Sequence, residues 1–136
     1  MEKHFLEGKM AGKPEFRAEP WYNPYGDCIE YQLVDEAFVA DRVDELLTIY
    51  RSVLDNRPIG FQIKGVQAII RKFGWEGLVV ASEAGAGQVR SVSVVALLLA
   101  AYETGPMTLG RRRAYAAVMD SSPKHHTIPA DDLVPA

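Results

Sequence analysis

Cysteine is almost absent from this chain, and its scarcity excludes a disulfide framework. Cys28 is the single cysteine among 136 residues, so no intramolecular disulfide can form, and nothing here indicates secretion. Asp27 and Glu30 lie close to it in sequence, and their negative charge is expected to raise the pKa of the thiol and weaken it as a nucleophile. We interpret Cys28 as a small side chain in a strand.

Long hydrophobic runs are also missing. The longest apolar run, Val92 to Tyr102, has 11 residues and contains Ser93, whereas a bilayer span needs about 20. Residues 1–7 lack the uninterrupted apolar core of a secretory signal. These two absences predict a cytoplasmic protein with no membrane partner.

An excess of positive charge is the third absence. The net charge is −3, which excludes a strongly basic nucleic-acid-binding protein as a class while leaving a local basic patch open. The charges are unevenly distributed: residues 27–45 hold seven acidic residues and one basic residue, whereas residues 46–136 hold ten basic and seven acidic residues. This polarity and the apolar run at 92–102 predict a homo-oligomer, most simply a two-fold dimer.

What the sequence does contain is alternation of apolar and polar residues, the pattern of half-buried strands. It occurs in three segments: Ile29-x-Tyr31-x-Leu33, Leu47-x-Ile49-x-Arg51-x-Val53 and Ile59-x-Phe61-x-Ile63. The turn-forming residues 55–58 separate the last two segments and predict a hairpin of 46–53 with 59–64. Strand-forming residues around Phe38 and Val43 indicate a further short strand.

Helical periodicity follows the hairpin. Apolar residues recur at i, i+3, i+4 and i+7 from Val66 to Phe73, and further helices are expected at about 94–103 and 108–119, the latter capped by Thr108. We predict that one face of the hairpin and this first helix pack together in the core through Ile59, Phe61, Ile63, Ile69, Ile70 and Phe73.

The predicted fold class is α+β: a small antiparallel sheet of three to five strands, drawn from residues 27–64 and 78–93, covered on one face by about three helices. The predicted domain organisation is a flexible N-terminal tail (1–20), a single domain (21–120) and an irregular C-terminal tail (121–136).

Catalytic, cofactor-binding and metal-binding residues are not assigned. The adjacent His125 and His126 would point in opposite directions on an extended segment, and a zinc site needs three or four ligands. An acid/base pair could come from the acidic segment, but charges on edge strands also serve to prevent aggregation. The carboxylates concerned are Asp27, Glu30, Asp41, Asp44 and Glu45.

One basic cluster and one aromatic segment have two interpretations each. Arg111, Arg112 and Arg113 lie on a predicted helix, where consecutive residues spread over about 200°, so a solvated surface or pairing with the acidic 27–45 region is favoured over phosphate binding.

The segment 21–27 holds three aromatic residues, which indicates a loop anchored on the core or, alternatively, a stacking platform for a base or sugar.

A weak ligand patch is expected on the polar face of the hairpin. Gln62 and Lys64 lie on that face, antiparallel pairing places Tyr50 alongside them, and Glu30 joins if the first strand is adjacent. The alternative is an ordinary solvated sheet face.

Three segments of the chain carry a resemblance: Trp-x-Asn-Pro-x-Gly-Asp-Cys-x-Glu from Trp21, Asp-x-Leu-Leu-Thr-x-Tyr-Arg-Ser from Asp44, and Ile-Gly-x-Gln-Ile-Lys-Gly from Ile59. Together they resemble a family of small bacterial proteins classed as a domain of unknown function. The resemblance covers about a third of the chain, from Trp21 to Gly65. It implies a small sheet-and-helix domain and no particular activity.

The function we expect from these observations is that of a non-catalytic cytoplasmic interaction or accessory domain, with a second copy or another protein as partner and no cofactor. Two alternatives remain: a hydrolase-like enzyme using carboxylates of residues 27–45, and a nucleic-acid accessory protein using Arg111 to Arg113.

Overall fold

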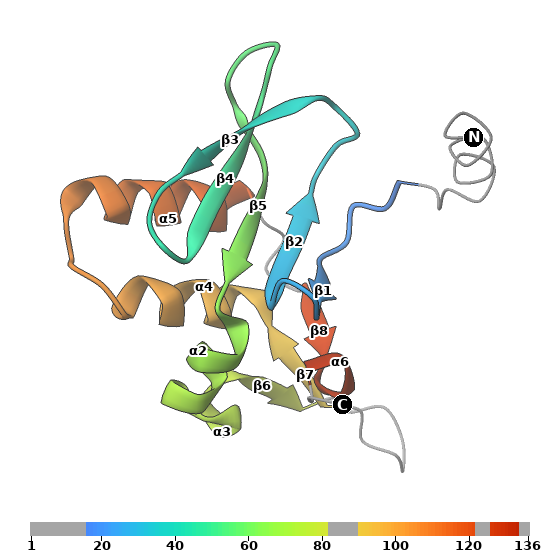
Figure 1. The fold of residues 1–136 in the computed structure, drawn as a ribbon, viewed down its shortest axis with the longest axis vertical. Helices are drawn as coiled ribbons and strands as arrows, with labels where there is room; N and C mark the ends of the chain where they lie inside the picture. Colours follow the sequence, from blue (N-terminus) through green and yellow to red (C-terminus); the bar gives the residue numbers. More distant parts are fainter. Residues whose placement is uncertain (1–15, 82–89, 122–125, 134–136) are drawn as a thin grey trace.

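The computed structural model describes residues 16–81, 90–121 and 126–133, which form two antiparallel sheets and five helices (Figure 1). The first sheet has the strand order β1-β2-β5-β4-β3. Its strands are β1 (Trp21–Asn23), β2 (Cys28–Gln32), β3 (Phe38–Arg42), β4 (Leu47–Ser52) and β5 (Pro58–Lys64). Most of the predicted N-terminal tail, residues 1–15, lies outside the described residues.

The predicted hairpin is confirmed as β4 and β5, with Leu47 opposite Ile63 and Ile49 opposite Phe61. A bulge between Tyr50 and Arg51 then shifts the register. The predicted alternation is wrong at its last residue: β4 ends at Ser52, and Val53 lies in the turn that follows, where its side chain is 55% exposed.

The strands predicted within residues 78–93 do not extend the first sheet. They form a second sheet of β6 (Val79–Ala81), β7 (Arg90–Ser93) and β8 (Thr127–Pro129), in that order. Figure 1 shows this small sheet below the first one.

The predicted irregular C-terminal tail is wrong over residues 127–133, where β8 and α6 (Ala130–Leu133) form. Ile128 and Leu133 are fully buried. Two apolar residues are too few to produce a periodic pattern in the sequence. Pro129 is the last residue of β8, an edge strand, where a missing N–H need not remove a ladder hydrogen bond.

The three predicted helices are confirmed as α2 (Val66–Phe73), α4 (Val94–Glu103) and α5 (Leu109–Ser121), and a short α3 (Trp75–Leu78) follows α2. The hydroxyl of Thr108 accepts a hydrogen bond from the Arg111 N–H at 3.3 Å, the N-cap contact that the sequence predicts. Gly74 ends α2 with a positive φ of 78°.

A single core joins both sheets and the helices. Phe61, Ile63, Ile69 and Ile70 are buried in it, and Phe73 packs against it half-buried. It extends to Leu133 and so beyond the predicted domain end at residue 120. Figure 1 shows α4 and α5 behind the first sheet, and their buried residues Leu97, Leu98, Tyr115 and Val118 belong to the same core.

Because the helices pack on one face of the first sheet, the opposite face is left for other contacts. We call it the outer face; it carries Glu30, Thr48 and Gln62, which lie opposite one another on β2, β4 and β5. In the part of the chain that the structure describes, no helix has the length and apolar character to cross a bilayer.

Candidate functional site

A groove of about 780 Å³ lies on the outer face of the first sheet. We call it the outer-face groove. Strands β2, β3 and β4 supply its floor, and the irregular segment before β1 supplies one wall. Its lining residues are Phe16, Arg17, Glu19, Pro20, Trp21, Glu30, Tyr31, Gln32, Phe38 and Tyr50.

A hydrogen bond between Tyr50 and Glu30 marks the floor of the groove. The Tyr50 hydroxyl donates to Oε1 of Glu30 at 2.6 Å, although the two residues lie on β4 and β2 with β5 between them. Gly60 is the β5 residue opposite Tyr50, and because it has no side chain, the tyrosine ring can cross β5 toward the carboxylate. Burial and then this hydrogen bond raise the pKa of the Tyr50 hydroxyl well above its ordinary value.

The aromatic part of the groove is built around Tyr50. Phe38 stacks on the Tyr50 ring with 4.2 Å between centroids and 27° between planes. Trp21 lies opposite Glu30 on the neighbouring strand β1 and is 53% exposed. The groove therefore combines aromatic surface with a carboxylate held on rigid strands.

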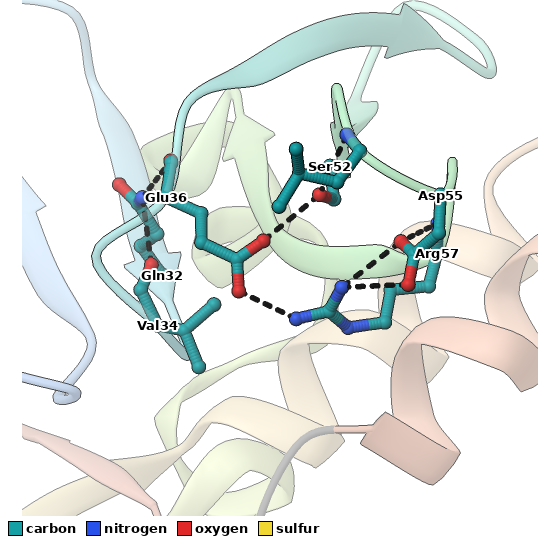
Figure 2. Close-up of polar contacts among 7 residues, drawn as sticks. Gln32, Val34, Glu36, Ser52, Asp55 and Arg57 are labelled. Atoms are coloured by element: carbon teal, nitrogen blue, oxygen red, sulfur yellow. Dashed lines mark hydrogen bonds and ion pairs between the residues drawn. The ribbon is translucent and has the colours of Figure 1, made fainter.

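Gln32 supplies an amide to the floor, and its donor atoms are already engaged. Its Nε2 donates to the backbone oxygens of Val34 at 2.8 Å and Glu36 at 2.9 Å (Figure 2). The side-chain oxygen Oε1 is the acceptor that this arrangement leaves.

The four residues of the predicted ligand patch share the outer face, but the groove does not include all of them. Glu30 and Tyr50 line it, whereas Gln62 and Lys64 do not. Gln62 lies opposite Glu30 and donates through Nε2 to Sγ of Cys28 at 3.7 Å. Lys64 lies opposite Cys28 and is exposed.

Sequence reasoning did not assign Trp21 and Phe38 to a site. The aromatic composition of residues 21–27 raised a stacking platform as an alternative, and Trp21 does lie in the groove. Phe38 carried no signal beyond strand propensity, because its neighbour in the groove, Tyr50, is reached only through the pairing of β3 with β4.

A second polar cluster connects the loops beside the groove (Figure 2). Glu36 accepts from the Ser52 hydroxyl at 2.9 Å and from Nη2 of Arg57 at 2.6 Å. Arg57 also binds both carboxylate oxygens of Asp55, at 2.9 and 2.8 Å. These contacts tie the β2–β3 loop to the β4–β5 turn, and their groups are engaged with one another.

Arg111 is buried rather than part of a basic surface. Its Nε lies 3.0 Å from Oδ2 of Asp44, its Nη1 donates to the Pro106 carbonyl, and the rings of Tyr102 and Tyr115 lie 5.2 Å from its guanidinium carbon. The predicted pairing of this helix with the acidic 27–45 region is confirmed for Arg111. That pairing removes Arg111 from a phosphate-binding row; Arg112 and Arg113 are both exposed on the helix surface.

Three of the other four acidic candidates have contacts of their own, and Glu45 is exposed. Asp27 accepts the Gln67 N–H at 3.1 Å at the start of α2, Asp41 pairs with Arg51 at 2.8 Å, and Asp44 holds Arg111. Of the five predicted carboxylates, Glu30 alone lines the outer-face groove.

Cys28 behaves as its neighbours predict. It is buried in β2, and burial first, then the charge of Glu30, raises the pKa of its thiol. Among the described residues, no group of three or more His, Cys, Asp or Glu side chains is placed to hold a metal ion.

No protein-family model, curated protein or solved structure matches this chain. The resemblance of residues 21–65 to a bacterial family therefore stays a prediction, and the groove has to be interpreted from its own residues.

Proposed function

We propose that this protein is a non-catalytic binding domain and that the outer-face groove holds its ligand. The observation that carries this proposal is a groove of about 780 Å³ with the Glu30–Tyr50 hydrogen bond on its floor. Small-molecule sites have volumes of about 300–1,000 Å³ and combine apolar and aromatic walls with a few placed polar groups. Strands hold such groups more rigidly than loops do.

The binding test uses Trp21 as the reporter. The chain has two tryptophans, so Trp75→Phe leaves Trp21, in the groove, as the only one. A panel of small aromatic compounds with positive, neutral and negative groups is titrated while tryptophan fluorescence and thermal unfolding are followed. We expect at least one class to give a saturable signal and to raise the melting temperature.

Two matched aromatic deletions locate the binding. Phe38→Ala removes an aromatic lining residue of the groove and is expected to weaken the binding. Tyr25→Ala removes a 99% exposed aromatic ring that does not line the groove and is expected to leave binding unchanged. Absence of saturation for every class at millimolar concentration, or an equal effect of the two variants, contradicts the proposal.

A second copy of this chain in the cytoplasm is the partner that we propose for the protein itself. The support is β3, an edge strand whose five residues are all exposed. An open edge presents backbone N–H and C=O groups that can pair with another strand. The buried free thiol of Cys28 is consistent with a reducing compartment.

A further inference from the structure

We infer that the ligand of the outer-face groove is a small organic cation, an ammonium group on an apolar body. This inference rests on the proposed binding function and specifies its ligand. Three independent properties of the lining residues support it: their charge, the polarity of their hydrogen bonds and their aromatic content.

The charge of the lining favours a cation. Glu19 and Glu30 are the acidic lining residues and Arg17 is the basic one. Glu30 lies on the floor, on a strand, whereas Arg17 and Glu19 lie on the exposed wall segment. A charge on the floor is screened less by solvent than charges on the exposed wall segment. The carboxylate of Glu30 therefore makes the electrostatic potential of the groove negative.

The hydrogen-bonding groups of the floor point to the same ligand. The Tyr50 hydroxyl donates its proton to Oε1 of Glu30, and the Gln32 amide donates to two backbone carbonyls. The floor therefore offers a ligand two hydrogen-bond acceptors, Oε2 of Glu30 and Oε1 of Gln32. Neither atom receives a hydrogen bond from the described residues. A ligand that supplies N–H donors fits these acceptors; a carboxylate or phosphate does not.

The aromatic lining completes the fit. Four aromatic side chains border the groove in addition to the core-facing Tyr31: Phe16, Trp21, Phe38 and Tyr50. The faces of such rings carry negative potential and attract an ammonium group, while the rest of the ring surface accepts an apolar body.

Three probes of nearly the same shape test the inference: benzylammonium, benzyl alcohol and benzoate, which carry a positive, neutral and negative group. Each is titrated into the isotope-labelled full chain at neutral pH, and backbone amide shifts of the groove strands are followed. We expect benzylammonium to bind about tenfold more tightly than benzyl alcohol, a difference of ~1.4 kcal/mol, and benzoate to bind most weakly.

A pair of charge-neutralising variants identifies the group responsible. Glu30→Gln keeps an acceptor for Tyr50 and removes the floor charge; we expect it to weaken benzylammonium binding about tenfold, ~1.4 kcal/mol, and to weaken benzyl alcohol binding by clearly less than that. Glu45→Gln makes the same chemical change at an exposed residue that does not line the groove. It should change the affinity for neither benzylammonium nor benzyl alcohol.

The outcomes separate the inference from the proposed function. If benzyl alcohol or benzoate binds at the groove strands as tightly as benzylammonium, the inference of a cationic ligand is wrong and the proposed binding function stands. The inference of a cationic ligand is also wrong if Glu30→Gln and Glu45→Gln have the same effect on benzylammonium binding. If none of the three probes produces saturable shifts in the groove strands, both the inference and the proposed function are contradicted.

Discussion

At the scale of single residues, Gly60 allows β5 to approach the backbone of β2 closely and leaves space beside Tyr50 of β4. A Cβ atom at this position would lie 2.2 Å from the backbone oxygen of Tyr31 and 3.0 Å from the Cα of Gln32. Both contacts are with strand backbone, which cannot move aside as a flexible side chain can. Gly60 also lies opposite Tyr50, so the same missing side chain leaves the path from Tyr50 to Glu30 open.

We therefore expect Gly60→Ala to lower the free energy of unfolding by about 3 kcal/mol, at the upper end of the usual range for overpacking. Urea unfolding followed by circular dichroism measures the change. Gly110→Ala is the matched control: a Cβ there meets nothing within 4 Å, and alanine in a helix is favoured by up to ~1 kcal/mol. Equal effects of the two substitutions would show that the close approach at Gly60 is unimportant.

At the scale of elements, Asp44 connects the β3–β4 turn to helix α5. Its carboxylate accepts from the backbone N–H groups of Leu46 and Leu47 at 2.8 and 2.7 Å, and from Arg111 and Tyr115 at 3.0 and 2.9 Å. Burial alone would raise the pKa of Asp44, but these donors outweigh it and hold the pKa below its ordinary value.

Asp44→Asn is expected to lower the free energy of unfolding at neutral pH by about 3 kcal/mol, because it leaves the Arg111 charge nearly buried without its partner. The sign of the pH dependence follows from the lowered pKa. The stabilisation by the carboxylate is complete above the unfolded pKa of about 4 and is lost as the pH falls through the folded pKa.

Urea unfolding of the parent and Asp44→Asn, at neutral pH and at several acidic values below about pH 4, tests this dependence. The gap in stability between the two proteins should narrow as the pH falls. Glu45→Gln, a change at the adjacent exposed carboxylate, should stay within about 0.5 kcal/mol of the parent. A gap that is constant across the acidic range would contradict the role given to the Asp44 charge.

At the scale of the whole molecule, one core serves two sheets, and the first sheet ends in the open edge of β3. Phe38 and Val39 on that strand are 38% and 53% exposed. Because a second β3 could pair with the open backbone groups of this edge and reduce the exposure of Val39, we predict a two-fold dimer formed through β3.

Sedimentation equilibrium of the full chain at low and high salt tests the dimer. Val39→Glu places a repelling charge at the edge and is expected to shift the protein to monomer, whereas Met107→Glu, at a 62% exposed residue between α4 and α5, should not. A parent protein that is monomeric in both salt conditions at about tens of micromolar, well above the dissociation constant of a stable dimer, would rule the β3 dimer out.

The sequence by itself determined the elements whose signals are local. The hairpin of β4 and β5 follows from a period of two and a turn cluster, and α2 from a period of 3.6, because each pattern lies within a few consecutive residues. The N-cap at Thr108 is equally local. The polar face shared by Tyr50, Gln62 and Lys64 also followed, since hairpin pairing sets which side chains lie on one face. Glu30 joins that face because β2 pairs with β5, a pairing that the sequence left open.

Only the tertiary structure decided what depends on residues far apart in the chain. The groove forms because segment 16–21, β2 and β3 meet around Tyr50, and no spacing within one segment encodes that meeting. Arg111 is buried because Asp44, 67 residues away, neutralises it, and the C-terminal β8 forms because β7 offers it a partner. In each case the stabilising partner is supplied by another element, so the physical reason is absent from the local pattern and present only in the folded chain.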